Sequence, residues 1–154
     1  MKEKKPQKIE FKIVEIKKIS HFENDFSDYG LDADDVITSK MEIGLNLNID
    51  GPKGTLAFNI KVKCFHRLEE NNFLLFGIES MYKYRIKNLN KLFKDKAEDK
   101  YNFPDNLMST LLNLAISGTR GMLAALNTTP AYQNIFLPII NPKTLLTDLK
   151  NNPL

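Results

Sequence analysis

The chain has 154 residues, of which 42% are hydrophobic and 27% charged, as is typical of a single globular domain. A chain of this length buries roughly 68–70% of its unfolded surface, so its fold needs neither disulfides nor a structural metal. The single cysteine, Cys64, excludes an intramolecular disulfide. No apolar run approaches the roughly 20 residues of a membrane span. We expect one domain over residues 1–154, with a basic tail at 1–8 and a short tail at 150–154.

The net charge of +3 is too small to indicate nucleic-acid binding by itself, but it is distributed unevenly. Seven lysines fall within the first 18 residues, whereas the segment from Glu23 to Asp35 holds six carboxylates and no lysine or arginine. The lysine-rich start also lacks the apolar core of a secretory signal, which predicts a cytoplasmic protein.

The first predicted element is a strand over residues 9–19. Apolar and polar residues alternate from Ile9 to Ile13, and the phase then slips to Val14, as a β-bulge would allow. The acidic segment that follows, residues 23–35, reads as a loop.

The clearest alternation in the chain runs from Met41 to Ile49 and predicts a second strand. Glycine and proline at residues 50–54 are typical of a tight turn, and residues 56–64 alternate again, so the two strands form a hairpin.

After a second turn at residues 69–72, a fourth strand is predicted over 73–86. It is apolar on both faces at first, so we expect it to be covered on both sides. Together the four strands predict an antiparallel sheet, with the first strand at an edge.

From residue 88 the period changes to that of helices. A charged crossover over residues 88–100 leads to Phe103-Pro104, which opens a long helix that runs to about Leu126 with a broad apolar stripe. Pro142 starts a last, short amphipathic helix. The predicted fold class is therefore α+β, with a long and a short C-terminal helix packed on the sheet.

Residues that carry chemistry are few. Cys64 and His66 lie two apart on one predicted strand, but their face continues a row of core residues, so we interpret Cys64 as a small buried hydrophobic residue. One cysteine and two histidines do not supply a zinc site without carboxylates.

Motifs for other ligands are incomplete. The acidic segment has Val36 and Ile37 where a calcium loop needs an oxygen ligand and glycine. Residues 118–121 lack the lysine of a phosphate loop, and the alternation of the fourth strand places Tyr82 and Tyr84 on its apolar face rather than under stacked bases. We therefore predict no catalytic residue, no metal, no cofactor and no nucleic acid, and a protein that is not an enzyme.

Four short strings resemble the SecB family of export chaperones, in the order and spacing of that family. They span about residues 9–149, and they are Phe22-Glu23; Phe73 with Gly77-Ile78-Glu79; Phe103-Pro104; and Ser117-Gly118-Thr119-Arg120-Gly121 followed by Leu137-Pro138-Ile139-Ile140-Asn141 and Leu145.

The resemblance implies a homotetramer, a dimer of dimers with the long helices between two sheets. It implies ATP-independent capture of unfolded polypeptides in hydrophobic grooves, with preproteins for export or an antitoxin as clients. Family members that serve the motor SecA have an aspartate three residues before the Phe, whereas this chain has Ile19 there, so docking on SecA stays open. The alternative function is an oligomeric adaptor that binds one folded partner.

Client-binding residues are predicted where apolar side chains have no evident core partner, in the crossover and the last helix, which border the client groove in the resembled family. Two aromatic residues near the acidic segment are added to them. The predicted residues are Phe22, Tyr29, Leu89, Leu92, Phe93, Leu145, Leu146 and Leu149.

Overall fold

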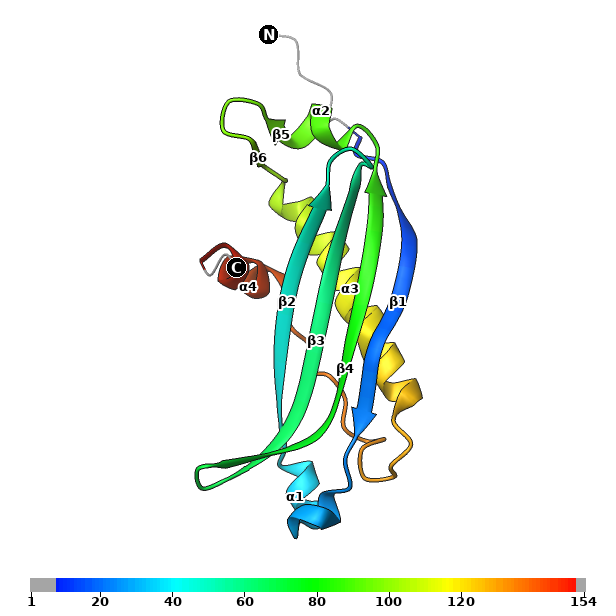
Figure 1. Ribbon diagram of the computed structural model, residues 1–154, viewed down its shortest axis with the longest axis vertical. Helices are drawn as coiled ribbons and strands as arrows, with labels where there is room; N and C mark the ends of the chain where they lie inside the picture. Colours follow the sequence, from blue (N-terminus) through cyan, green and yellow to red (C-terminus); the bar gives the residue numbers. More distant parts are fainter. Residues whose placement is uncertain (1–7, 152–154) are drawn as a thin grey trace.

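The computed structural model describes residues 8–151, and the side chains of residues 8–149 (Figure 1). Its centre is a four-stranded antiparallel sheet in the order β1-β4-β3-β2, which confirms the predicted sheet and the edge position of the first strand. The strands are long, and they are β1 (Phe11–Glu23), β2 (Lys40–Asp50), β3 (Thr55–Leu68) and β4 (Asn71–Ile86).

Strand β1 contains the expected bulge and runs further than expected. Its register against β4 shifts between Ile13 and Glu15, where the apolar alternation slips, and again between Lys18 and Ser20. The second shift allows pairing to continue to Glu23, so the expected end at residue 19 is wrong.

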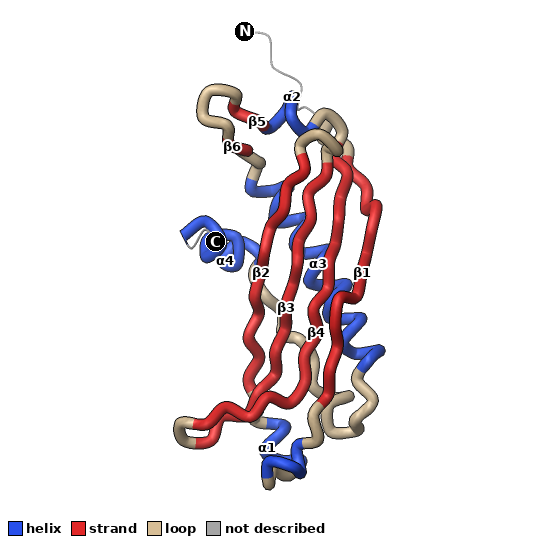
Figure 2. The backbone as a smooth tube through the Cα atoms, viewed as in Figure 1, coloured by secondary structure: helices blue, strands red, loops and turns tan. Residues whose placement is uncertain are grey.

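Two helices cover one face of the sheet and confirm the α+β class. Helix α3 (Asp105–Leu126) crosses diagonally behind the strands, and the short helix α4 (Pro142–Asn151) packs beside β2 and α3 (Figures 1 and 2). Pro104 is the residue before the first turn of α3. Residues 150 and 151 belong to α4, not to a tail, and the rest of the two expected tails, residues 1–7 and 152–154, lies outside the described residues.

The core lies between α3 and the helix-facing side of β3 and β4. Phe58, Tyr84, Leu111 and Leu112 are fully buried there, and the Tyr84 hydroxyl donates a 2.7 Å hydrogen bond to the Leu111 carbonyl. Strand β4 is buried on both faces only over residues 75–78. Outside residues 75–78, the face of β4 that points away from the helices is partly exposed and bears Glu79 and Lys83. The expected cover on both sides therefore holds for residues 75–78 alone.

The acidic segment is more ordered than a loop. It forms a 3₁₀ helix, η1 (Phe26–Tyr29), and a short helix, α1 (Ala33–Ile37). Aspartates start both helices: Asp25 accepts the Ser27 backbone N–H, and Asp32 and Asp35 form a reciprocal capping box. Three of the six carboxylates, Asp25, Asp32 and Asp35, therefore cap helices, which the loop prediction overlooked.

The crossover between β4 and α3 holds a short helix, α2 (Leu89–Phe93), and a small two-stranded sheet made of β5 (Lys94–Asp95) and β6 (Lys100–Tyr101). In the ribbon view it lies at the end of the sheet opposite to α1 (Figure 1).

The first of the strings that resemble the SecB family, Phe22-Glu23, connects β1 to β4 and to the residues that follow α3. The ring of Phe22 covers Gly77, its register partner on β4, so closely that a Cβ on Gly77 would lie 2.7 Å from it. Glu23 accepts hydrogen bonds from the backbone N–H groups of Thr128 and Thr129. Partial burial opposes ionisation of Glu23, but these hydrogen bonds outweigh it and hold the pKa of the carboxyl below its ordinary value.

The Ser117–Gly121 string has a similar structural role. Gly118, not Gly121, is the glycine of close approach, because a Cβ on Gly118 would overlap the Tyr82 hydroxyl, whereas Gly121 faces open space. Arg120 donates hydrogen bonds of 2.8 and 2.9 Å to the carbonyls of Leu137 and Pro138 and so fixes the segment before α4. Helix α3 continues past this string to Leu126.

Candidate functional site

The apolar face of β2 is only partly covered. Its alternating apolar residues, at positions 41 to 49, are half-buried, because β2 is an edge strand and the helices reach over it incompletely. They contrast with the fully buried partners on β3, such as Phe58 opposite Leu47 and Ile60 opposite Leu45. The sheet therefore keeps an incompletely buried apolar stripe along this edge.

A hollow of about 330 Å³ lies over one end of this stripe. The edge strand, the residues after β6, the start of α3 and one side of α4 form its walls. Its lining is Leu47, Ile49, Tyr101, Asn102, Phe103, Asp105, Met108, Leu146 and Leu149, and we call it the apolar groove. Three stretches that are distant in sequence, residues 47–49, 101–108 and 146–149, thus contribute to one mainly apolar concavity.

Aromatic packing forms the crossover wall of the apolar groove. The rings of Tyr101 and Phe103 are nearly parallel with centroids 5.9 Å apart, and Phe93 packs behind Phe103 at 5.2 Å. The Tyr101 hydroxyl donates a 2.7 Å hydrogen bond to Asn90 Oδ1 of α2. Lys94 Nζ lies 5.8 Å from the centre of the Tyr101 ring, and the Asp99 carboxylate, 2.9 Å away, raises the pKa of Lys94. The hydrogen bond from Tyr101 to Asn90 therefore attaches this wall of the groove to α2.

Helix α4 forms the opposite wall. Leu146 is buried and anchors the helix, whereas Leu149 is partly exposed and lines the groove. Because Arg120 holds the preceding segment by its carbonyls, α4 stands at a fixed place beside β2. Arg120 thus constrains the segment that leads into the α4 wall of the groove.

The predicted client-binding residues separate into groups. Leu146 and Leu149 line the apolar groove, and Phe93 supports its aromatic wall from a buried position. Leu89, the first residue of α2, is buried, and Leu92 and Leu145 are half-buried against the core. Phe22 and Tyr29 lie elsewhere: Phe22 covers Gly77, and Tyr29 packs on Phe73 with ring centroids 5.2 Å apart.

Several groove residues were not among those predictions. The alternation of β2 assigned Leu47 and Ile49 to the core, and Phe103 was interpreted only as the opening of α3. The sequence did contain a signal for Leu47 and Ile49, because apolar residues on an edge strand have fewer neighbours to cover them than those on a central strand.

The reactive side chains do not form a catalytic arrangement. Cys64 is fully buried and donates its thiol hydrogen to Ser39 Oγ at 3.1 Å, and burial raises the pKa of this thiol, which disfavours the thiolate. His66 Nε2 lies 3.9 Å from Asp35 Oδ1. Within residues 8–151 there is no group of three or more histidine, cysteine or acidic side chains that could hold a metal ion, nor a helix long and apolar enough to cross a membrane.

Comparisons with known proteins add two structural likenesses. No protein-family model and no curated protein matches the chain. A SecB-like chaperone of Mycobacterium tuberculosis, in complex with a peptide from the HigA1 antitoxin, matches with a TM-score of 0.49 and 12% identity, over 84% of this chain and 90% of that one. A Streptococcus agalactiae protein of unknown function matches with a TM-score of 0.33 and 14% identity, over 86% of this chain and 100% of that one. Both likenesses are too low to carry a function from one protein to another.

Proposed function

We propose that this protein is an ATP-independent chaperone that holds unfolded polypeptides through the apolar groove, with preproteins for export or an antitoxin as client. The observation that supports it most is the groove itself, an open apolar hollow that continues into the half-buried stripe of β2. The four strings that resemble the SecB family point to the same function.

The groove suits extended, apolar segments of another chain. Each apolar side chain that a client buries contributes about 25 cal/mol per Å² of surface removed from water, without any covalent step. Several weak contacts along one client add up, because after the first contact the others form at a high effective concentration. A concavity of about 330 Å³ has room for one or two apolar side chains of a client.

The proposal includes a homo-oligomer in the cytoplasm. Phe11, Ile13 and Ile16 of β1 are 38%, 44% and 52% exposed although they pair with the helix-facing residues of β4. The diagonal course of α3 leaves this half of β1 without cover (Figure 1). An edge strand with exposed apolar residues is a natural surface for pairing with a second chain, and a tetramer is the assembly that the SecB resemblance implies.

The test is suppression of aggregation, without nucleotide, for two or three unrelated proteins diluted from denaturant. A chaperone of this kind protects each of them at a similar stoichiometry. An adaptor for one folded partner protects none, and that result would refute the proposal.

A further inference from the structure

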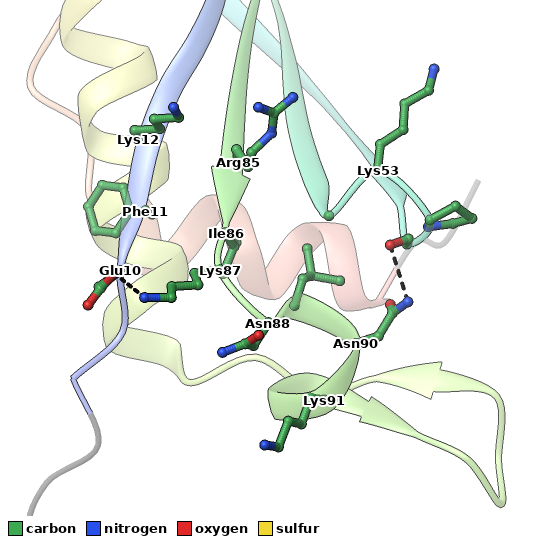
Figure 3. A pocket seen from close by; sticks show the side chains of 14 residues that line it. Glu10, Phe11, Lys12, Lys53, Arg85, Ile86, Lys87, Asn88, Asn90 and Lys91 are labelled. Carbon is green, nitrogen blue, oxygen red and sulfur yellow. Dashed lines mark hydrogen bonds and ion pairs between the residues drawn. The ribbon is translucent and has the colours of Figure 1, made fainter.

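A second hollow, of about 600 Å³, lies at the same end of the sheet as α2 and differs from the apolar groove in charge. It is formed by the start of β1, the turn between β2 and β3, the end of β4 and helix α2 (Figure 3). Five cationic side chains and one carboxylate line it: Lys12, Lys53, Arg85, Lys87, Lys91 and Glu10. We call it the cationic hollow.

The carboxylates near the cationic hollow already have partners. Glu10 pairs with Lys87 at 3.1 Å, Asp50 with Lys53 at 3.7 Å, and Glu15 with Lys83 at 2.9 Å. Lys12, Arg85 and Lys91 have no carboxylate partner among residues 8–151. Three exposed cations are therefore left for a ligand from outside the described chain.

The position of two of these cations is unfavourable for the isolated fold. Lys12 on β1 and Arg85 on β4 are direct register partners, and like charges opposite each other across an antiparallel pair destabilise a sheet. In Figure 3, dashed lines join Glu10 to Lys87 and Asn90 to Gly51, and none reaches Lys12 or Arg85. A bound anion would relieve the repulsion between Lys12 and Arg85.

A hydrogen bond joins the lining of the cationic hollow to that of the apolar groove. Asn90 lines the hollow, and its Oδ1 accepts the hydrogen bond from Tyr101 of the groove, while its Nδ2 donates to the Gly51 carbonyl at 3.2 Å. The hollow and the groove are therefore adjacent, within reach of one extended polypeptide.

We propose that the cationic hollow binds an acidic segment of a polypeptide client, so that preferred clients carry carboxylates beside their apolar segment; this rests on the proposed chaperone function. Carboxylates match isolated lysine and arginine side chains by charge-assisted hydrogen bonds. A nucleic acid is the poorer fit, because beyond the hollow the lysines on the open face of the sheet alternate with Glu15, Glu42 and Glu79 and form no continuous cationic track.

The experiment measures binding of a fluorescein-labelled oligoglutamate peptide by fluorescence anisotropy. The test variant is Lys12→Gln/Arg85→Gln/Lys91→Gln. Its matched control, Lys17→Gln/Lys40→Gln/Lys61→Gln, removes the same charge from exposed lysines outside the hollow. We expect Kd to rise about tenfold in the test variant and at most about threefold in the control, since each exposed ion pair contributes little.

Salt gives a second readout that needs no variant. Binding of oligoglutamate to the unmodified protein should weaken strongly as ionic strength rises, because exposed charges are screened. Equal losses in test and control variants, or no binding at low salt, would overturn the proposal. Tighter binding of a single-stranded oligonucleotide of equal charge, lost in the same test variant, would also overturn it.

The two proposals fail separately. Oligoglutamate has no apolar side chain, so Leu149→Ser in the groove should leave its binding unchanged. Oligoglutamate binding without any suppression of aggregation would contradict the chaperone function and leave the cationic hollow as an anion-binding site. Suppression of aggregation without oligoglutamate binding would support the chaperone function and contradict binding of acidic segments in the cationic hollow.

Discussion

Replacing Leu149 by serine tests the apolar groove directly. Leu149 is half-buried on the apolar side of α4 and lines the groove, whereas Leu145 on the same helix packs against the core and does not line it. Leu145→Ser is therefore a control that removes the same side chain from the same helix. We expect Leu149→Ser to weaken client binding and Leu145→Ser to affect mainly the free energy of unfolding.

The magnitude follows from the area that a client covers. Burying a whole leucine side chain is worth about 1.5–3 kcal/mol, and since Leu149 is already partly buried we assign about a third of that, ~0.5–1 kcal/mol, to cover by the client. The client surface that faces Leu149 loses its cover as well, which doubles the loss to about 1–2 kcal/mol, or about five- to thirtyfold in Kd.

The assay titrates a labelled, permanently unfolded polypeptide with each variant, and circular dichroism and light scattering check fold and assembly. If Leu149→Ser binds clients as tightly as the unmodified protein while its fold is intact, the groove is not the client site. Equal weakening by Leu145→Ser and Leu149→Ser would show that the effect comes from loss of α4 packing instead.

Four further predictions concern stability, ligands and assembly. Gly118→Ala should lower the free energy of unfolding by about 1–3 kcal/mol, because its Cβ would overlap buried Tyr82. Gly121 faces open space on the same helix, so Gly121→Ala should raise the free energy of unfolding by about 0.5–1 kcal/mol. Urea titration measures both changes. Glu23→Gln should cost ~1 kcal/mol at neutral pH. Because the folded-state pKa of Glu23 is lowered, its stabilisation is present above the unfolded pKa and is lost as pH falls through the folded pKa, so the difference from the unmodified protein should vanish in acid. A chelator should leave the melting temperature unchanged, and a shift of several degrees would reveal a metal site. Light scattering should give a multiple of 17.7 kDa, and a concentration-independent monomer would contradict the oligomer.

Local patterns were enough to predict the sheet and the two C-terminal helices. The alternation of β2, the turn residues at 50–54 and the change of period after β4 are all properties of neighbouring residues. Even the bulge near Ile13 could be located, because one extra residue moves the apolar phase to the other face.

The acidic segment shows where local interpretation failed. Its density of carboxylates suggested a solvated loop, but Asp25, Asp32 and Asp35 cap short helices that bury Val36. The spacing of Asp32 and Asp35 is that of a capping box with aspartate in place of the usual glutamate, so the start of this helix could have been predicted from the sequence.

The candidate groove could be predicted only in part, because non-local packing builds it. Leu146 and Leu149 stood out as apolar residues on a short terminal helix, but their neighbours Leu47 and Tyr101 come from positions far away in the chain. The course of α3 across the sheet decides which core-patterned residues of β2 stay half-covered, and local sequence patterns do not contain it.

The central claim is that the protein distinguishes unfolded from folded chains. It is tested most directly by titrating it, without nucleotide, with one polypeptide in two forms, native and permanently unfolded by reduction and alkylation of its disulfides, and measuring Kd by calorimetry. We expect binding of the unfolded form with a negative heat-capacity change, because apolar surface is buried, and no binding of the native form. Equal binding of both forms, or of neither, would contradict it.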